Sequence, residues 1–370
     1  MPFGGTAIVR NLKLMERITI HDVARLAGVS IKTVSRVVNG EPNVSERTRE
    51  RVERAVRQLN YRPNPAARQL GGSRSFLLGL FYDNPSASYI INVQNGVLAE
   101  SRARGFDLVL HPCNYTDRQL VNEFLSAAAQ LRLDGLILTP PLTDNGSLVE
   151  VLAERGIPFV SISPAEATPR APLCVKTNDR SVCAAMTQCL LAMGHRRIAF
   201  LAGHPDHAAI RHRELGYLDA LSAAGIAVDR ELIVQGYNDY DSGFDGTNRL
   251  LALEDPPTAV FAANDDMAAG AMTAVHEAGL SVPSQISIAG FDDVPLAAHV
   301  WPTLTTIRQP IEKMASKATE LLLERLQGDT LDNQSVVIDS ELVFRNSTLR
   351  PGQRRDNKSG LPPGKGKRYG

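Results

Sequence analysis

Near the N-terminus, the segment HDVARLAGVSIKTVSRVVNG holds two short apolar repeats that are separated by Gly28-Val29-Ser30. Glycine takes up the left-handed conformation that ends a helix at little cost, and a serine hydroxyl satisfies free N–H groups at the start of the next helix. Thr19 and Asp22 fit a capping box at the start of the first repeat. The segment therefore predicts two short helices joined by a three-residue turn.

A third apolar repeat follows from Ser45. Its members recur at helical spacing and are Val52, Ala55, Val56 and Leu59. Two short helices around a tight turn, braced by a third, predict an all-α helix-turn-helix domain over residues 17–62.

A polar row follows the turn. The side chains predicted to point outward from the second helix are Ile31, Lys32, Ser35, Arg36 and Asn39. Arginine can bind guanine, asparagine can bind adenine, and an apolar side chain can contact a thymine methyl, so the row suits the major groove of DNA. Near the helix starts, hydroxyls and N–H groups can hold phosphates, and we assign this role to Thr19, Ser30, Thr33, Asn43 and Thr48. The alternative is a solvated face of a three-helix bundle.

Charge is divided unevenly along a chain whose 40 Lys/Arg and 40 Asp/Glu cancel. Residues 16–72 carry 11 Lys/Arg against 6 Asp/Glu, and residues 350–370 carry 7 against 1. The body between them is therefore acidic, and a basic head on an acidic body indicates that the head meets a polyanion. We expect residues 1–16 to be a flexible extension and the basic, Gly/Pro-rich residues 350–370 to be disordered.

From residue 76 to residue 349, apolar strands alternate with amphipathic helices, which predicts an α/β fold with parallel sheets. The run is long for one open sheet, so we expect two doubly wound halves. The predicted strands are 76–82, 106–111, 133–139, 158–162, 197–202, 232–235, 259–262 and 286–291. The predicted helices are 90–104, 118–131, 180–193, 212–224, 243–253 and 265–278; a helix over 310–326 and an alternating strand over 335–344 close the fold.

Several classes of protein are disfavoured by what the sequence lacks. The four cysteines show no CxxC spacing and no histidine at metal-ligand spacing, which favours reduced thiols in the cytoplasm and no metal site. The chain begins without a secretory pattern and has no apolar run of membrane length. No GxGxxG follows the first strand, and no P-loop or catalytic triad is evident. We therefore expect no enzyme, no cofactor and no membrane partner.

The segment ITIHDVARLAGVSIKTVSRVVNGEPNVSERTRERVERAVRQLNYRPNPAARQL resembles the DNA-binding head of the lactose-repressor (LacI/GalR-type) family of bacterial transcription regulators. The resemblance continues through LAMGHRRIAFLAG, AANDDMAAGAM, ISIAGFDD and PTLTTIRQP, and it covers roughly residues 17–349. It implies a body like the periplasmic sugar-binding proteins, with an effector, a mono- or oligosaccharide, held between its two subdomains. It also implies a homodimer on double-stranded DNA with a palindromic operator, acting as a repressor. No leucine heptads follow residue 349, so a dimer is expected rather than a tetramer.

The connector NYRPNPAARQLGG, within residues 63–75, predicts a very short helix. Asn64 can cap it, but a helix of this length is marginal in water, because nucleation costs more than its few hydrogen bonds return. The resemblance implies that paired hinge helices insert a leucine into the minor groove; Leu70 matches that position, and Ala67 lies one turn earlier. Such a wedge unstacks a base step and bends the duplex. The alternative is an ordinary flexible linker.

The carboxyl ends of parallel strands predict the effector site. They select Asp83, Asn84, Ser163, Asn264 and Asp292, and the neighbouring helix starts and loops add Ser88, Tyr89 and Arg213. The resemblance places Arg213, Asn264 and Asp292 at effector contacts, where they can exchange hydrogen bonds with sugar hydroxyls. Tyr89 or Phe291 offers an apolar ring face.

Other roles stay open for some of these residues. Asp292 and Asp265 can instead cap a helix or turn, and we expect Trp301 to pack near the hinge crossing. Ser161 and Ser163 stand where several sugar-responsive members of the family carry an aspartate, so the chain departs from the galactoside-responsive pattern. A solute-binding receptor is the competing function, and the helix-turn-helix segment argues against it.

We predict that Leu70→Ala weakens binding to a specific operator far more than binding to random DNA, because the wedge contributes only where the duplex is bent. Titrations of both DNAs at one salt concentration measure this. Equal losses on the two would contradict the hinge assignment.

Overall fold

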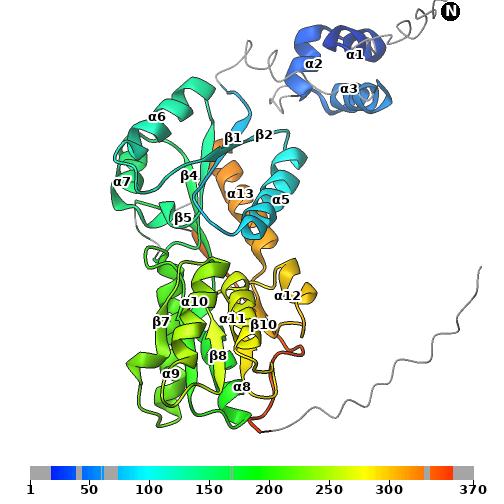
Figure 1. Ribbon diagram of the computed structural model, residues 1–370. Helices are drawn as coiled ribbons and strands as arrows, with labels where there is room; N and C mark the ends of the chain where they lie inside the picture. The colour runs from blue at the N-terminus through cyan, green and yellow to red at the C-terminus, as the bar shows by residue number, and fades with distance from the viewer. Residues whose placement is uncertain are drawn as a thin grey trace, which may run out of the picture. The chain divides into compact units, whose positions relative to one another are not determined.

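The computed structural model describes residues 18–38, 44–59, 61, 74–166, 168, 170–328 and 334–352. The chain divides into two compact units, residues 1–76 and 77–370 (Figure 1). The predicted extension, most of the predicted hinge and the predicted tail lie outside the described residues, and so do five candidate DNA-binding residues: Asn39, Asn43, Asn64, Ala67 and Leu70.

The described part of the first unit consists of α1 (Ile20–Ala27), α2 (Ile31–Val38) and α3 (Glu46–Leu59). Their apolar faces meet in one small core, formed by Val23, Ala24, Ala27, Val34, Val37, Val52 and Ala55. Because so few side chains fill this core, the helix ends must also be well satisfied for the unit to hold its shape.

The predicted helix ends are confirmed. The Asp22 carboxylate accepts hydrogen bonds from the Thr19 N–H at 2.9 Å and from the Thr19 hydroxyl at 2.7 Å. These two bonds lower the pKa of Asp22. Gly28 takes the left-handed conformation, with φ of 61°, and the Ser30 hydroxyl accepts the Thr33 N–H at 3.2 Å. Residues that lie close together in the sequence therefore define the helix-turn-helix geometry.

The second unit holds two parallel sheets, as predicted. The first half has a six-stranded sheet in the order β11-β5-β4-β3-β1-β2, and the second half has a four-stranded sheet in the order β7-β6-β8-β9. The elements of the first half are β1 (Leu77–Tyr82), α5 (Ala87–Ala103), β2 (Asp107–Pro112), α6 (Leu120–Leu131), β3 (Gly135–Leu138), α7 (Gly146–Glu154), β4 (Phe159–Ile162), β5 (Leu173–Thr177), α13 (Ile311–Gln327) and β11 (Gln334–Ile338). Those of the second half are α8 (Asp179–Ala192), β6 (Ile198–Ala202), α9 (Ala208–Ala223), β7 (Ile233–Gln235), α10 (Tyr240–Leu251), β8 (Ala259–Ala262), α11 (Asp265–Glu277), β9 (Ser287–Ala289), α12 (Pro295–His299), β10 (Thr306–Arg308) and β12 (Glu341–Val343).

Strands such as β3, β4, β6 and β8 are buried along their whole length, since helices cover both faces of each sheet (Figure 1). This burial explains their continuous apolar runs. The strands predicted between residues 76 and 291 are all present, with small shifts at their ends.

The chain passes between the two halves three times, after β5, after β10 and after β11. The Ser340 N–H donates to Asn178 Oδ1 at 2.9 Å, so two of the crossings are joined side by side. The remaining crossing, the one after β10, contains Gln309, whose N–H donates to the Asp292 carbonyl at 3.2 Å. Any movement of one half against the other must pivot on these segments.

The single strand predicted over residues 335–344 is wrong. Its first part, β11, pairs with β5 in the first half, and its second part, β12, pairs antiparallel with β10 in the second half. The alternating pattern suits both strands equally, so it does not reveal the break. The break follows from Ser340, whose N–H bonds to Asn178 instead of to a neighbouring strand. β10 is absent from the sequence prediction because it has only three residues, and β5 because its apolar run is interrupted by Lys176 and Thr177.

Trp301 does not pack near a crossing, so that expectation is also wrong. Its side chain is 88 % exposed. The described residues contain no helix that is both long enough and apolar enough to cross a membrane.

Two glycines let α10 and α11 approach closely. A Cβ added to Gly270 would lie 2.1 Å from the Tyr240 carbonyl oxygen, and one added to Gly243 would lie 2.2 Å from the Met267 carbonyl oxygen. Both contacts involve backbone, which cannot move aside as a side chain can. The pair of helices is therefore packed backbone against backbone.

We predict that Gly270→Ala lowers the free energy of unfolding by about 1–3 kcal/mol, the usual cost of overpacking a filled site. Urea unfolding of the two proteins measures the change. Gly146→Ala in α7 is the matched control, because nothing lies within 4 Å of its added Cβ, and alanine favours helices over glycine. A loss as large in the control would contradict the packing explanation.

Candidate functional site

The head presents the outward row of α2 to solvent. Ile31 and Lys32 are exposed, and Ser35 and Arg36 are half-exposed, whereas the valines of the opposite face are buried. An amphipathic helix that keeps this mixture of polar and apolar groups accessible can enter a major groove.

A groove in the head brings the starts of two helices together. The hydroxyls of Ser30 and Thr33 lie 2.9 Å apart at the start of α2, and those of Ser45 and Thr48 lie 2.9 Å apart at the start of α3. The groove is lined by Val29, Ser30, Thr33, Arg36, Val44, Ser45, Thr48 and Arg51. Helix starts, hydroxyls and two arginines together suit phosphate groups.

The structure thus gathers most of the predicted phosphate-binding residues that it describes. Thr19 is the exception, since it starts α1, bonds to Asp22 and does not line the groove. Ser45 and Arg51 line the groove but are absent from the predicted set; Ser45 begins the third helix, and the capping rule could have selected it.

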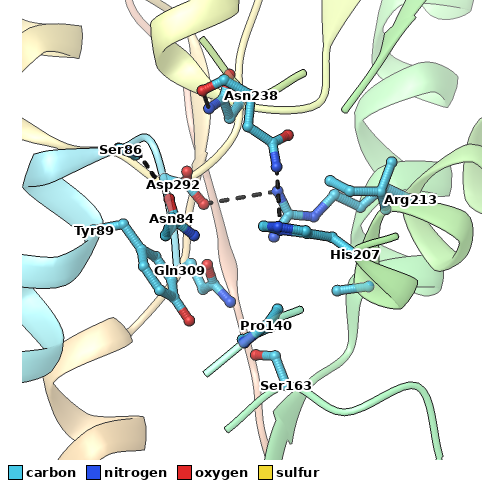
Figure 2. A pocket seen from close by; sticks show the side chains of 13 residues that line it. Asn84, Ser86, Tyr89, Pro140, Ser163, His207, Arg213, Asn238, Asp292 and Gln309 are labelled. Atoms are coloured by element: carbon cyan, nitrogen blue, oxygen red, sulfur yellow. Dashed lines mark hydrogen bonds and ion pairs between the residues drawn. The ribbon is translucent and has the colours of Figure 1, made fainter. Parts of the chain in front are cut away.

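In the second unit, a polar pocket lies where strand ends of the two halves face each other (Figure 2). Its empty space is about 430 Å³. The lining residues are Asn84, Ser86, Tyr89, Pro140, Ser163, His207, Ala209, Ile210, Arg213, Asn238, Asn264, Asp292 and Gln309. Most of them follow the carboxyl end of a strand, as expected for an open parallel sheet.

Arg213 is the charged centre of the pocket. It is buried on α9, its Nε donates to Asp179 Oδ2 at 3.1 Å, and its Nη1 lies 3.7 Å from Asp292 Oδ1. Burial alone would lower the pKa of Arg213, but the two carboxylates outweigh it and raise the pKa. The guanidinium also lies 3.5 Å above the Phe291 ring centre. Phe291 lies beneath this guanidinium and does not line the pocket, so the alternative that its ring faces a ligand is wrong.

Asp292 joins the pocket to a crossing between the halves. Its N–H donates to the Ile307 carbonyl at 2.8 Å, and its own carbonyl accepts from Gln309. Burial raises the pKa of its carboxyl to about 7, although the nearby Arg213 opposes the rise. A ligand that contacts this carboxyl is therefore linked, through the Asp292 backbone, to a segment on which movement of the halves must pivot.

The side chain of Asn264 is already engaged. Its Oδ1 accepts the Met267 N–H at 2.9 Å and so caps α11, and its Nδ2 donates to the Asn238 carbonyl at 2.8 Å. Asp265, for which capping was the alternative, is buried and instead accepts hydrogen bonds from the Val294 N–H and the Thr306 hydroxyl. Asn264 thus fixes the loop that carries Asn238 into the pocket.

His207 contributes a neutral ring to the pocket. Its Nδ1 accepts a hydrogen bond of 3.2 Å from Asn238 Nδ2, which leaves the proton on Nε2. Burial, aided by the nearby His204 and Arg213, lowers the pKa of His207 to about 3. Figure 2 shows His207 and Arg213 on the opposite side of the pocket from Tyr89 and Gln309.

Two predicted residues are not brought into this pocket. Asp83 accepts the Tyr115 N–H at 2.9 Å, and Ser88 lies half-exposed on α5; neither is part of the lining. Tyr89, Ser163, Arg213, Asn264 and Asp292 do line it.

The sequence prediction missed Ser86, His207, Asn238 and Gln309. Asn238 follows β7 and could have been selected by the strand-end rule. Gln309 belongs to a crossing segment, and only the tertiary structure shows that this segment passes the pocket.

Two buried oxygens of the pocket have no hydrogen-bond partner among the described residues. They are Gln309 Oε1 and Ser163 Oγ. Buried polar atoms are nearly always paired, so these two indicate groups that a bound molecule or water satisfies. Within the described ranges, no cluster of three or more His, Cys, Asp or Glu side chains is arranged to hold a metal ion.

A helix-turn-helix unit and a two-lobed unit with a polar pocket between its lobes, joined in one chain, define a ligand-responsive DNA-binding protein. Comparison with known proteins agrees. Residues 19–64 match the family described as bacterial regulatory proteins, lacI family, and residues 187–348 match the periplasmic binding protein-like domain.

Similar proteins cover nearly the whole chain. The probable HTH-type transcriptional repressor ExuR of Bacillus subtilis (strain 168) is 33 % identical over 90 % of this chain and 99 % of its own length. The ribose operon repressor of Escherichia coli (strain K12) is 35 % identical over 89 % of this chain and 99 % of its own length. A lac repressor dimer bound to operator and the anti-inducer ONPF matches with a TM-score of 0.70 and 31 % identity, over 90 % of this chain and 100 % of that one. A complex of the transcriptional regulator CelR with cellobiose matches with a TM-score of 0.69 and 33 % identity, over the same shares of the two chains. The chain belongs to the lacI family of bacterial transcription regulators.

We predict that His207→Gln makes the protein less sensitive to acid. Since the pKa of His207 is lowered in the folded state, the unfolded chain binds the extra proton between about pH 6.5 and pH 3. The parent therefore loses stability as pH falls through that window, by at most about 1.4 kcal/mol per pH unit from this group.

Urea unfolding at a series of pH values measures the two slopes. Exposed His299→Gln on α12 is the control and should follow the parent. Parallel curves for parent and His207→Gln would show that the ring is not held neutral by the fold.

Proposed function

We propose that this protein binds a palindromic operator as a homodimer and changes its operator affinity when a small hydroxylated effector, a sugar, occupies the pocket between its halves. The observation that carries the proposal is that the pocket residue Asp292 is hydrogen-bonded directly to the crossing segment at Gln309. The similarity to the ribose operon repressor and to the CelR–cellobiose complex supports a sugar as the ligand class.

An effector in this pocket touches both halves at once. Tyr89 and Ser86 come from the first half, and Arg213 and His207 come from the second. A ligand shifts a conformational equilibrium only by its difference in affinity for the two states. A molecule that bridges the halves has such a difference, because opening the pocket removes contacts on one side.

The surface of α10 and α11 supports dimer formation. Tyr240 is 42 % exposed, and its hydroxyl bonds to Thr273 at 2.6 Å. Trp301 lines a groove together with Met272 and His276 of α11. A tryptophan that is 88 % exposed is costly in water. The related lac repressor structure is a dimer, so a second copy of the chain is the proposed cover.

The proposal places the protein in the cytoplasm, where operator DNA is found, and gives it no catalytic role. Its relatives named above are transcriptional repressors, which supports repression as the outcome. The competing function is a solute receptor that does not bind DNA. That function would not explain the groove formed by the starts of α2 and α3. The proposed hinge over residues 63–75 links the two activities by folding only on specific DNA.

We predict that Arg36→Ala weakens specific operator binding about 10- to 100-fold, which is the worth of one good side-chain contact to a base or phosphate. Operators enriched from random DNA should be inverted repeats, and fluorescence anisotropy measures affinity. Arg57→Ala on α3 is the matched control; it removes an exposed arginine that pairs with Glu53 outside the groove. Failure to enrich any inverted repeat would overturn the proposed function.

We predict that Trp301→Glu shifts the protein from dimer towards monomer and weakens operator binding as a consequence, because the charge would be buried in the interface. Analytical ultracentrifugation across a concentration series measures the dissociation constant. Val228→Glu, at a surface valine that is 41 % exposed and away from this groove, serves as control. An unchanged dimer would remove Trp301 from the interface.

A further inference from the structure

The charges of the pocket are already balanced before any ligand arrives. Arg213 is the only lysine or arginine among the lining residues. Its guanidinium is shared among Asp179, Asp292 and the Ala263 carbonyl. His207 adds no positive charge, since its Nδ1 is occupied as an acceptor. An anionic ligand would find no unpaired cation and would meet the Asp292 carboxyl.

Further carboxylates lie beside residues that line the pocket. Asp266 accepts the Ser86 hydroxyl at 2.7 Å, and Asp206 accepts the Tyr115 hydroxyl at 2.5 Å. Asp144 accepts the Ala208 N–H at 3.4 Å. A carboxylate or phosphate moved from water into these surroundings loses its hydration without gaining a counter-charge.

The unpaired acceptors of the pocket can be satisfied by hydrogen-bond donors on a ligand. Gln309 Oε1 is a pure acceptor with no hydrogen-bond partner among the described residues, and Asp292 can accept more than it does. A hydroxyl group on a ligand can donate to both, whereas a carboxylate or phosphate oxygen can only accept. Leaving the acceptors unpaired would cost affinity.

Hydrogen bonds also join the two halves beside the pocket. The pairs Ser86–Asp266 and Tyr115–Asp206 each connect a residue of the first half to a residue of the second, and Ser86 lines the pocket. A ligand that holds the halves further apart must break these bonds.

From the balanced charges and the unpaired acceptors we infer that the effector is a neutral polyhydroxylated molecule, a neutral sugar in chemical class. The pocket discriminates against the same sugar carrying a carboxylate or phosphate. The inference rests on the proposed function, because it takes the pocket to be the effector site.

Isothermal titration of the full-length protein with matched sugars tests the inference. The panel pairs neutral sugars, cellobiose among them, with the corresponding uronates and sugar phosphates. We expect at least one neutral sugar to bind, with its charged counterpart weaker by about 100-fold or more. Binding of a uronate or a sugar phosphate that equals or exceeds that of its neutral counterpart overturns the inference, and so does a lack of binding by every neutral sugar.

A variant locates the discrimination in the charge. Asp292→Asn keeps the shape of the side chain and removes its negative charge, so the affinity ratio between the neutral sugar and its uronate should fall at least tenfold. Asp293→Asn is the matched control: Asp293 is equally buried and pairs with Arg308 and Arg345, but it does not line the pocket. It should change both affinities together and leave their ratio as in the parent. A ratio unchanged in Asp292→Asn would contradict the electrostatic argument.

The same titrations in the presence of the selected operator separate the two proposals. Release of operator by a uronate or a sugar phosphate, but by no neutral sugar, would refute the ligand class while leaving the regulatory function standing. Tight binding of a neutral sugar by a protein with no operator preference would support the ligand class and refute the regulatory function.

Discussion

A buried arginine needs its counter-charges in place, and this need organises the centre of the molecule. Arg213 lies on α9, but Asp179 begins α8 and Asp292 follows β9. The three side chains meet only if both helices and the sheet of the second half are correctly assembled. Removing one partner would leave an uncompensated charge in the interior. The ion pairs therefore connect the integrity of the fold to the chemistry of the pocket.

The same centre touches the segments on which the two halves move. The backbone of Asp292 is bonded on one side to β10 and on the other to Gln309. Ser340 and Asn178 join the remaining crossings. A molecule held by Asp292 and Gln309 thus acts at the pivot itself, so a small displacement there can become a larger change in how the halves are spaced.

The head, in contrast, is defined mainly by interactions between residues that are close in the sequence. Its capping residues, left-handed glycine and helix starts are local in sequence, so neighbouring residues suffice to define the turn. The groove that we propose for phosphate groups comes from bringing two such starts together through a small apolar core. Local rules were enough to predict Ser30, Thr33 and Thr48, and they missed Arg51 because its place in the groove depends on the packing of α3.

In the body, the sequence by itself determined the alternation of strands and helices, the presence of two halves and the candidacy of Asp292, because apolar periodicity and strand ends are local signals. Arg213 was a candidate through its place near a predicted helix start and through the family resemblance. Only the tertiary structure decided that residues 335–344 serve two sheets, that Gln309 reaches the pocket and that Phe291 is covered by a guanidinium. Each of these depends on contacts between segments far apart in the chain, and an alternating or apolar pattern is compatible with more than one such partner.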